Sequence, residues 1–543
     1  MKKTFKGLSA ILMTSVLAVS ASAATVGSLT ASAASIAVNS TDGGSYTAYP
    51  ILTGSVNGSS LGNVNYATGF SLTSALLTEL KGDSTFGSGT SNAFNDLSTS
   101  SPASAFAADI AKLSTTAQQE RFAKIIGKYT TTGGLTVGTD TSDIAEGYYV
   151  IKGTNSKGTS LNLLNVVGTV EISGKGDSPS SAKTVDDKND STGAAETGKD
   201  TADYDIGDTI PYTLTFTLPS DYASYEKYPI TFVDDMCAGL SYNGDAKIWY
   251  GTVTGEGEDI TFSHDTEATS ATTSGKVYKA TISDLKVTKP ALTADTVITI
   301  KYTATLNANA VIGNDGTATA GNPNTYNVIF ANDPNWYDDG EGGTQPDTPP
   351  TGETPKKTNT VFTYKLVVNK IKSDNTALTG ADFDLYKFVE GTGSDTYKVG
   401  ETTYSGKWTL VTALNTGEGA VNPSKSAVAA DTTSFTFSGI DDGVYKLVES
   451  TTPKGYNTIE PIIFTIAPTS DGYLPNTIKL GSEAFSCTDS SGAISGNVVN
   501  NAGVTLPGTG GMGTTIFYIV GGLMISGALV LLIVRKRMSI KEK

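Results

Sequence analysis

The sequence predicts an all-β protein of tandem β-sandwich domains, with a secretory signal peptide at one end and a C-terminal transmembrane helix at the other. The chain is rich in Gly, Thr, Ser, Val and Tyr, and long helical periodicities are scarce. Apolar and polar residues alternate in short segments such as YTLTFTL (212–218) and TVITIKYTATL (296–306), which is typical of strands. Because 543 residues are too many for one hydrophobic core, about three or four domains are expected.

The composition argues against several classes of function. A net charge of −16 argues against nucleic-acid binding and fits an extracellular surface. The two cysteines, Cys237 and Cys487, lie far apart and are interpreted as buried hydrophobes or unpaired thiols. The single histidine, His264, excludes a multi-histidine metal site and argues against a histidine-based triad. No cofactor or metal is expected, because the acidic residues within 333–339 match no defined calcium loop.

Residues 1–34 are expected to be a secretory signal peptide. Three lysines precede an apolar stretch that starts at Leu8 and gives way to small residues. Cleavage after Ala23 and cleavage in the later ASA stretch at 31–33 both fit this pattern. The mature protein is therefore predicted to be secreted.

Residues 504–543 have the order of parts that a sorting signal requires. The pentapeptide LPGTG is followed by an apolar run at 516–534, of membrane-spanning length, and by the basic residues 535–537. The basic tail predicts a cytoplasmic C-terminus, with everything before the span outside the cell. The five residues of the pentapeptide are Leu506, Pro507, Gly508, Thr509 and Gly510.

This ordered set resembles the cell-wall sorting signal of Gram-positive surface proteins. The resemblance implies that a sortase cysteine attacks the carbonyl of Thr509 and releases the chain from Gly510 onward. The acyl group then passes to an amine.

Three β-domains are expected between the two ends. The first combines strand patterns with helical spacing at 71–80 and 105–128, which predicts a β-sandwich with a helical insertion. A segment rich in Pro, Gly and acidic residues is interpreted as an exposed linker before the last domain. The predicted boundaries are 1–34 (signal peptide), 35–172, 173–337, 338–357 (linker), 358–503 and 504–543 (sorting signal, transmembrane helix and basic tail).

In the third predicted domain, polar side chains interrupt core-facing rows of apolar residues. In FTYKLVVNK, the position that follows four inward-facing apolar residues is Lys370. By the same alternation, Glu449 shares the apolar face of VYKLVES, and Asn500 that of SGNVVNN. Asn501 is the nearby alternative for the asparagine, but it faces the other way.

The second predicted domain repeats this pattern. Asp234 shares the apolar face of PITFVDDM, and Asn332 that of NTYNVIFAN. Lys183 supplies the amine, with Val185 two residues further on its strand. Asp235 is the alternative acid and points to the opposite face.

A buried lysine, acid and asparagine have one economical chemical use. Burial lowers the pKa of an amine and raises that of a carboxyl, because it disfavours both charged forms. A neutral amine is a nucleophile, and a protonated carboxyl polarises the asparagine carbonyl and shuttles the proton that ammonia needs to leave. Held in contact, lysine and asparagine condense to an amide in an autocatalytic step without turnover. A buried salt bridge, or a lysine that reaches out to water, satisfies the same alternation.

Two stretches resemble known pilin domains. The text YKLVVNKIKSDNTALTGADFDLYK, followed by GVYKLVESTTPKGY, resembles the collagen-adhesin B-type repeat, which implies an isopeptide bond from Lys370 to Asn500 with Glu449 as the acid. The text DIGDTIPYTLTFTLP, then ITFVDDMCAGLSYNGDAKIWY and GNPNTYNVIFANDPN, resembles the fimbrial isopeptide-forming domain. That likeness implies the roles of lysine, acid and asparagine for Lys183, Asp234 and Asn332. Ig-like folds are expected for these domains.

The resemblance also implies a lysine that receives the threonine of the next subunit. The stretch VEISGKGDSPS places this role on Lys175, although the aromatic residue and the proline common in the family motif are absent. An ordinary solvated linker lysine fits equally. Lys152, Lys157 and Lys188 are the alternatives.

The resulting interpretation is a major pilin, the shaft subunit of a fimbrium that supports cell adhesion. Expected partners are pilin-specific and housekeeping sortases, other copies of the chain, peptidoglycan and minor pilins, with no nucleic acid. The expected location is the cell wall, after a transient membrane stage. A monomeric wall-anchored adhesin is the first alternative. A surface enzyme is disfavoured, because no nucleophile and base of a cleft type can be assembled from these residues.

Overall fold

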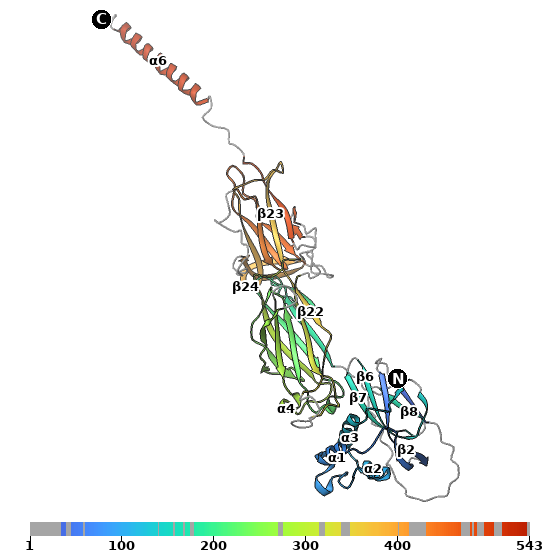
Figure 1. Ribbon diagram of the computed structural model, residues 1–543. Helices are drawn as coiled ribbons and strands as arrows, with labels where there is room; N and C mark the ends of the chain where they lie inside the picture. Colours follow the sequence, from blue (N-terminus) through green and yellow to red (C-terminus); the bar gives the residue numbers. More distant parts are fainter. Residues whose placement is uncertain are drawn as a thin grey trace.

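The chain forms three β-rich parts that follow one another, with a helix, α6 (Gly513–Ser539), standing apart beyond the third (Figure 1). The predicted all-β class is confirmed, since strands outnumber helices in each part. This computed structural model describes residues 34–39, 45–57, 60–138, 141–155, 158–166, 169–173, 179–269, 275–313, 321–337, 348–399, 401–411, 431–467, 478–480, 483–485, 493–503 and 513–539.

The first part contains two sheets and a group of helices. One sheet has the order β3-β2-β6-β7 with β4 paired to β2, and the other has the order β5-β1-β8. The helices lie between β3 and β4 in the chain, where the helical insertion is expected. The elements are β1 (Ala34–Asn39), β2 (Ser45–Asn57), β3 (Ser60–Tyr66), α1 (Ser74–Gly82), η1 (Ser84–Phe86), η2 (Gly89–Ser91), α2 (Ala103–Ile110), α3 (Thr116–Tyr129), β4 (Leu135–Val137), β5 (Thr141–Ile144), β6 (Gly147–Asn155), β7 (Gly158–Val166) and β8 (Thr169–Ser173).

The helical stretch expected at 105–128 is two helices. Thr115 stops the pattern because its hydroxyl accepts a hydrogen bond from the Gln118 amide, while the Gln118 side chain accepts from the Thr115 amide. This capping box starts a new helix, α3. The helices are held by buried aromatic rings, among them Phe94 stacked on Phe122 at 5.6 Å between centroids.

The second part is a sandwich of two seven-stranded sheets. Their orders are β10-β9-β12-β19-β15-β16, with β14 on β19, and β11-β22-β20-β13-β18-β17, with β21 on β20. One buried cluster joins residues from both sheets. The elements are β9 (Ser180–Lys188), β10 (Ala195–Lys199), β11 (Thr201–Asp203), β12 (Thr209–Thr217), η3 (Tyr222–Ser224), β13 (Ile230–Met236), β14 (Leu240–Tyr242), β15 (Lys247–Tyr250), β16 (Glu258–Asp259), β17 (Ser263–Thr269), β18 (Lys276–Ile282), α4 (Leu285–Thr288), β19 (Val297–Leu306), β20 (Asn322–Ala331), β21 (Thr351–Glu353) and β22 (Lys357–Phe362).

The predicted linker at 338–357 is too long. Strand β21 pairs with β20, and β22 pairs with both β20 and β11, so residues 351–362 complete the second sandwich. The proline-rich composition hid two short strands, because β22 closes the sheet with the buried Asn359 and Val361 and has no long apolar run. The third part therefore starts at β23 (Tyr364–Lys372) rather than at residue 358.

The third part is a smaller sandwich of a three-stranded sheet, β26-β23-β31, and a four-stranded sheet, β25-β24-β27-β28, with the pair β29-β30 beside them. Its first and last strands, β23 and β31, are parallel neighbours. The remaining elements are β24 (Asp382–Val399), β25 (Thr402–Leu410), β26 (Ser434–Ile440), β27 (Gly443–Thr451), β28 (Ile462–Ile466), β29 (Ile478–Leu480), β30 (Glu483–Phe485) and β31 (Ala493–Asn500).

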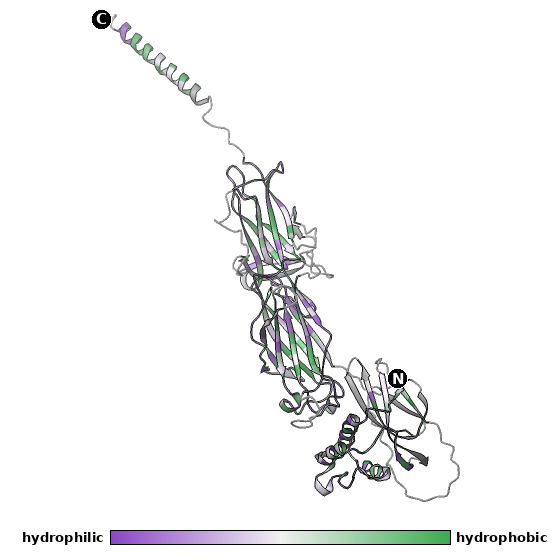
Figure 2. Cartoon of the chain, in the orientation of Figure 1, coloured by the Kyte–Doolittle hydropathy of each residue, from purple (hydrophilic) through white to green (hydrophobic). Residues whose placement is uncertain are grey.

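Helix α6 has the properties of a membrane span. Residues Ile516–Met538 have a mean hydropathy of 2.5, and none of that window is buried against the rest of the chain. Figure 2 shows apolar residues along this helix and a hydrophilic C-terminal end, where Lys536 and Arg537 lie. This arrangement fits the predicted transmembrane helix with its basic tail.

Candidate functional site

The predicted lysine, acid and asparagine of the third part meet in its core. Lys370 on β23 and Asn500 on β31 project from adjacent parallel strands, and Glu449 projects from β27 in the facing sheet. The side chains of Lys370 and Glu449 are 0% exposed, and Asn500 is fully buried. Lys370 Nζ donates to the carboxamide oxygen of Asn500, and to the Val498 carbonyl at 3.0 Å. Asn501 is exposed, so alternation chose the correct asparagine here.

Glu449 holds the other end of the same carboxamide. Its Oε1 and Oε2 accept hydrogen bonds from Asn500 Nδ2 at 2.9 and 3.2 Å, and its Oε1 lies 3.7 Å from Lys370 Nζ. The Ile459 amide and the Thr452 hydroxyl also donate to Oε2, each at 3.2 Å, and fix the carboxyl in place. The amine thus faces the carboxamide oxygen, and the acid faces the nitrogen that would leave as ammonia.

The second part buries a comparable group between its two sheets. Lys183 on β9 donates from Nζ to Asp234 Oδ1 at 2.6 Å, and Asp234 belongs to β13 in the opposite sheet. The two side chains are 0% and 2% exposed. Burial lowers the pKa of the Lys183 amine, and the Asp234 carboxylate only partly opposes this effect. The alternative acid, Asp235, lies on the other face of β13.

Asn332 is not near this lysine, and the prediction for this residue is wrong. Asp234 pairs across the sheet with Tyr326 on β20, whereas Asn332 lies six residues further along, roughly 20 Å away. Asn324 is two residues from Tyr326 on the same face and is fully buried. Alternation assigned the correct face, but it cannot give the height along the strand, so 324 and 332 looked equivalent.

Asn324 is tied to the lysine through a tyrosine hydroxyl. Tyr302 Oη accepts from Lys183 Nζ at 3.0 Å and from Asn324 Nδ2 at 2.8 Å. The buried Asn359 is a less suitable partner, since its amide nitrogen donates to the main-chain carbonyls of Lys199 and Asp200 at 3.2 and 3.1 Å. Asn324 is therefore the asparagine that the geometry favours.

Several predicted residues lie outside the described residues, namely Lys175, Lys157, Cys487, the LPGTG pentapeptide and the signal peptide. Of the alternative lysines, Lys188 is exposed, whereas Lys152 donates to the Thr130 carbonyl at 2.7 Å and lies over the Tyr49 ring. Burial lowers the pKa of Lys152. Cys237 is buried and forms no disulfide with any residue that the structure describes.

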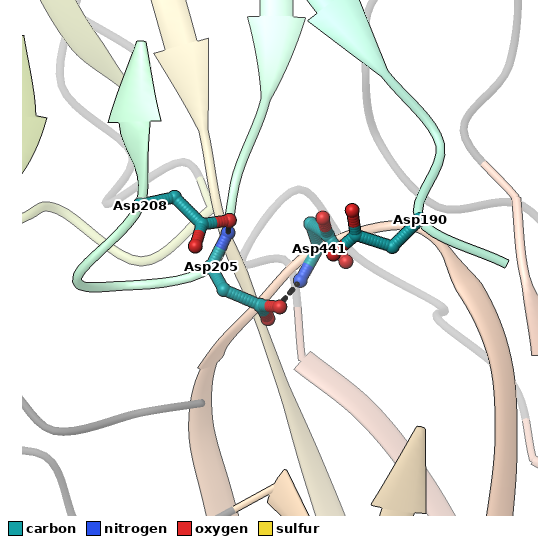
Figure 3. Close-up of side chains that lie close together, drawn as sticks. All are labelled: Asp190, Asp205, Asp208 and Asp441. Atoms are coloured by element: carbon teal, nitrogen blue, oxygen red, sulfur yellow. Dashed lines mark hydrogen bonds between the residues drawn. The ribbon is translucent and has the colours of Figure 1, made fainter. Parts of the chain in front are cut away.

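A fourth site, which the sequence analysis missed, lies between the second and third parts. Figure 3 shows Asp190, Asp205, Asp208 and Asp441, whose carboxylate oxygens lie within 4.8 Å of one another. Lys387 on β24 donates from Nζ to Asp205 at 2.9 Å, to Asp190 at 3.0 Å and to Asp441. The ammonium of Lys387 therefore supplies the positive charge for the group. A signal was present, because Lys387 continues the apolar face formed by Phe383 and Leu385.

This junction holds the two parts together through main-chain bonds as well. The Ile206 amide donates to the Gly439 carbonyl at 2.9 Å, and the Glu390 amide to the Asp190 carbonyl at 2.8 Å. Ser191 bridges the parts, since its hydroxyl donates to the Phe388 carbonyl at 2.7 Å. The contacts are dense enough to fix how the two parts meet.

The charge state of the junction lysine differs from that of Lys183. Burial opposes the charge of Lys387, but the carboxylates of Asp205 and Asp441 outweigh burial and hold its pKa well above the usual value. On the acid side, burial and the neighbouring Asp205 raise the pKa of Asp208 to about 7. Burial and Asp442 raise the pKa of Asp187 to about 6.

The fold, the LPGTG pentapeptide and α6 together define a wall-anchored surface protein with several β-sandwich domains. Family models specify its type. Residues 206–334 match the Gram-positive pilin backbone subunit 2, Cna-B-like domain, 364–477 match the SpaA prealbumin-like fold domain, and 498–539 match the LPXTG cell wall anchor motif. These matches identify the chain as a wall-anchored protein of the Gram-positive pilin type, a structural rather than an enzymatic family.

Individual relatives agree with this assignment. The trypsin-resistant surface T6 protein of Streptococcus pyogenes serotype M6 is 23% identical over 368 residues, which are 61% of this chain and 65% of that protein. Among solved structures, the T6 backbone pilin of serotype M6 S. pyogenes is 17% identical, with a TM-score of 0.49, and the match covers 88% of this chain and all of that one. The major pilin SpaD of Corynebacterium diphtheriae is 14% identical, with a TM-score of 0.42 and coverages of 87% and 98%.

Replacing the junction lysine is expected to destabilise the protein strongly. Lys387→Met leaves buried carboxylates without a cation, and breaking a buried charge pair in this way costs about 3–5 kcal/mol. Denaturant unfolding should show this loss, whereas the surface control Lys398→Met, at a side chain 57% exposed, should stay within about 0.5 kcal/mol of the wild type. Equal stability of both variants would contradict the role given to Lys387.

Stability is expected to fall as the pH rises through 7. The Asp208 carboxyl has a raised pKa of about 7 when folded, against about 3.9 when unfolded, so the folded state binds more protons between these values. Its contribution is fully present below the unfolded pKa and is lost as the pH rises through the folded pKa. Calorimetry from pH 5.5 to 8 should show a falling Tm with a weaker slope in Asp208→Asn. An unchanged slope would contradict this assignment.

Proposed function

We propose that the chain is the major, shaft-forming subunit of a pilus, which sortases polymerise and attach to peptidoglycan. The observation that carries the proposal is the combination of a wall-anchor motif with two β-sandwiches that each bury a lysine beside an acid and an asparagine. A shaft must survive pulling, and covalent ties inside each subunit meet that demand. Adhesion would follow from the position of the shaft on the cell surface.

In the third part, the proposed bond joins Lys370 to Asn500. The neutral amine attacks Cγ of Asn500, and Glu449 accepts the proton from Nζ and passes it to Nδ2, which leaves as ammonia. A new amide C–N bond replaces the old one, so the balance is one ammonia lost. Glu449 already lies within hydrogen-bond distance of the leaving nitrogen.

In the second part, the proposed bond joins Lys183 to Asn324, with Asp234 as the acid. The lowered pKa of Lys183 favours the neutral, nucleophilic amine. The hydrogen bond to Asp234 provides the route by which the amine loses its proton. The ion pair between Lys183 and Asp234 would be the final state if no bond formed.

The two bonds would close loops of more than a hundred residues. Lys370 and Asn500 are 130 residues apart in the chain, and Lys183 and Asn324 are separated by a similar length (324 − 183 = 141). By analogy with a disulfide, closing such a loop stabilises by roughly 5 kcal/mol through the unfolded state. The mechanical effect is larger, because β23 and β31 are neighbours and the bond would pass a pulling force directly between them.

Polymerisation would use the sorting signal and a lysine of the first part. A pilin-specific sortase cuts after Thr509 and joins it to Lys175 of the next subunit, and a housekeeping sortase transfers the finished polymer to peptidoglycan. Minor pilins are further expected partners. The position of Lys175, directly after β8, is at the end of the first part of the chain.

Intact-mass measurement of the secreted, untagged chain tests the internal bonds. The mass should fall short of the calculated value by one ammonia per bond, two in all. Glu449→Ala and Asn324→Ala should each abolish one loss, because they remove the acid of one site and the carboxamide of the other. Asn332→Ala is the matched control and should keep both. A wild-type mass without any loss would refute both bonds.

Denaturing gels of cell-wall extracts test polymerisation. A shaft subunit should give a ladder of high-mass species, since the links between subunits are covalent, and Lys175→Ala should reduce it to a single band. Lys188→Ala serves as the control on a nearby exposed lysine. A single band in wild-type cells would instead favour a monomeric wall-anchored adhesin.

A further inference from the structure

The two buried sites differ in how the acid reaches the asparagine. In the third part, Glu449 itself contacts both Lys370 and Asn500. In the second part, the acid is an aspartate, one methylene shorter, which accepts from Lys183. The contact with Asn324 is made by the hydroxyl of Tyr302, which lies between the amine and the carboxamide.

Tyr302 is held rigidly in this position. It lies on β19 opposite Tyr212 on β12, and the two rings stack at 5.3 Å between centroids. Lys183 on β9 is next to β12 in the same sheet, so the amine and the hydroxyl come from one layer of the sandwich. Tyr302 is buried, which keeps water from competing for its hydroxyl.

The hydrogen bonds of this hydroxyl leave one proton to be used. A tyrosine hydroxyl has one proton to donate and accepts through its lone pairs, one of which takes the Lys183 ammonium or amine. Asn324 Oδ1 is buried and accepts no hydrogen bond from the described residues. The two halves of a carboxamide have nearly the same shape. Turning the group by 180° brings Oδ1 to the place of Nδ2, 2.8 Å from Tyr302 Oη, where the hydroxyl donates to it.

We propose that Tyr302 is a catalytic residue for the Lys183–Asn324 bond, through a hydrogen bond from its hydroxyl to the carbonyl oxygen of Asn324. This inference rests on the proposed bond chemistry and assigns a further part in it. As Nζ attacks Cγ, the electron pair of the carbonyl moves to Oδ1, and a donor placed there stabilises the negative charge of the tetrahedral intermediate. Asp234 takes the proton from Nζ and delivers it to Nδ2, which leaves as ammonia while the carbonyl re-forms.

The hydroxyl keeps its own proton throughout the reaction. Burial, with the Asp234 carboxylate in addition, raises the pKa of Tyr302 well above its usual value, so it acts as a donor and not as a base. The tyrosine thus gives the second part the contact to the carboxamide that the longer Glu449 makes directly in the third. Each site has one group for the amine and one for the carboxamide, divided differently between residues.

The test compares both bonds within one molecule. The secreted chain is made by cell-free synthesis, quenched in denaturant at intervals, and digested, and the two cross-linked peptides are quantified by mass spectrometry. In Tyr302→Phe the Lys183–Asn324 bond should form roughly 100-fold more slowly, the effect of removing one such donor. The Lys370–Asn500 bond should form at the wild-type rate and reports that the chain is otherwise sound.

Tyr326→Phe is the matched control. It removes an equally buried hydroxyl from the same core, which donates to the Thr215 carbonyl at 3.3 Å. This variant should form both bonds at wild-type rates. Equal rates in Tyr302→Phe and the wild type would overturn the role of Tyr302 and leave the bond chemistry intact. Absence of the Lys183–Asn324 bond from the wild type would overturn the bond itself.

If Tyr302→Phe slows the bond by disturbing the fold, protection from proteolysis will show it. Before the bond forms, the second part of Tyr302→Phe should resist a nonspecific protease as well as that of Lys183→Ala, which also lacks the bond. Lower resistance in Tyr302→Phe would assign the slowed reaction to misfolding and overturn the proposal.

Discussion

The burial of lysine side chains away from water is the constraint on which the two C-terminal sandwiches depend. An unpaired buried charge costs several kcal/mol, so each such lysine must either lose its proton or be surrounded by negative charge. Lys183 faces one carboxylate, and burial wins, which lowers its pKa. Lys387 faces three, and the carboxylates win, which raises its pKa. The number of acids around a buried lysine thus separates a nucleophile from a structural cation.

These two kinds of site act in series along the chain. The proposed bonds tie strands within each sandwich, and the Lys387 cluster ties one sandwich to the next. In the third part the force would enter at β23 and leave at β31, which are parallel neighbours. A subunit built in this way transmits tension through covalent bonds inside its domains and through a buried ionic cluster between them.

Much of this arrangement could be predicted from residue alternation. The core-facing positions of Lys370, Glu449, Asn500 and Asp234 follow from the period of two in a strand. The position of Asn324 does not, because alternation is the same at 324 and 332 and only the pairing of β13 with β20 fixes the height. The extent of the second sandwich was also hidden, since β21 and β22 follow a proline-rich segment and add few apolar residues.

The junction between the second and third parts was beyond the sequence for a different reason. Lys387 and its acids come from four separate segments, and nothing local indicates that they meet. Tyr302 likewise looked like an ordinary core residue of β19, because its function depends on the two side chains that its hydroxyl joins. Long-range pairing, and not local pattern, decides both sites.

A crystal structure of the mature protein at atomic resolution tests the central claim most directly. The account predicts continuous electron density from Lys370 Nζ to Asn500 Cγ and from Lys183 Nζ to Asn324 Cγ, each with an amide bond length of about 1.33 Å. Separate side chains at a hydrogen-bond distance of about 2.8 Å, with the carboxamide nitrogens still present, would contradict it.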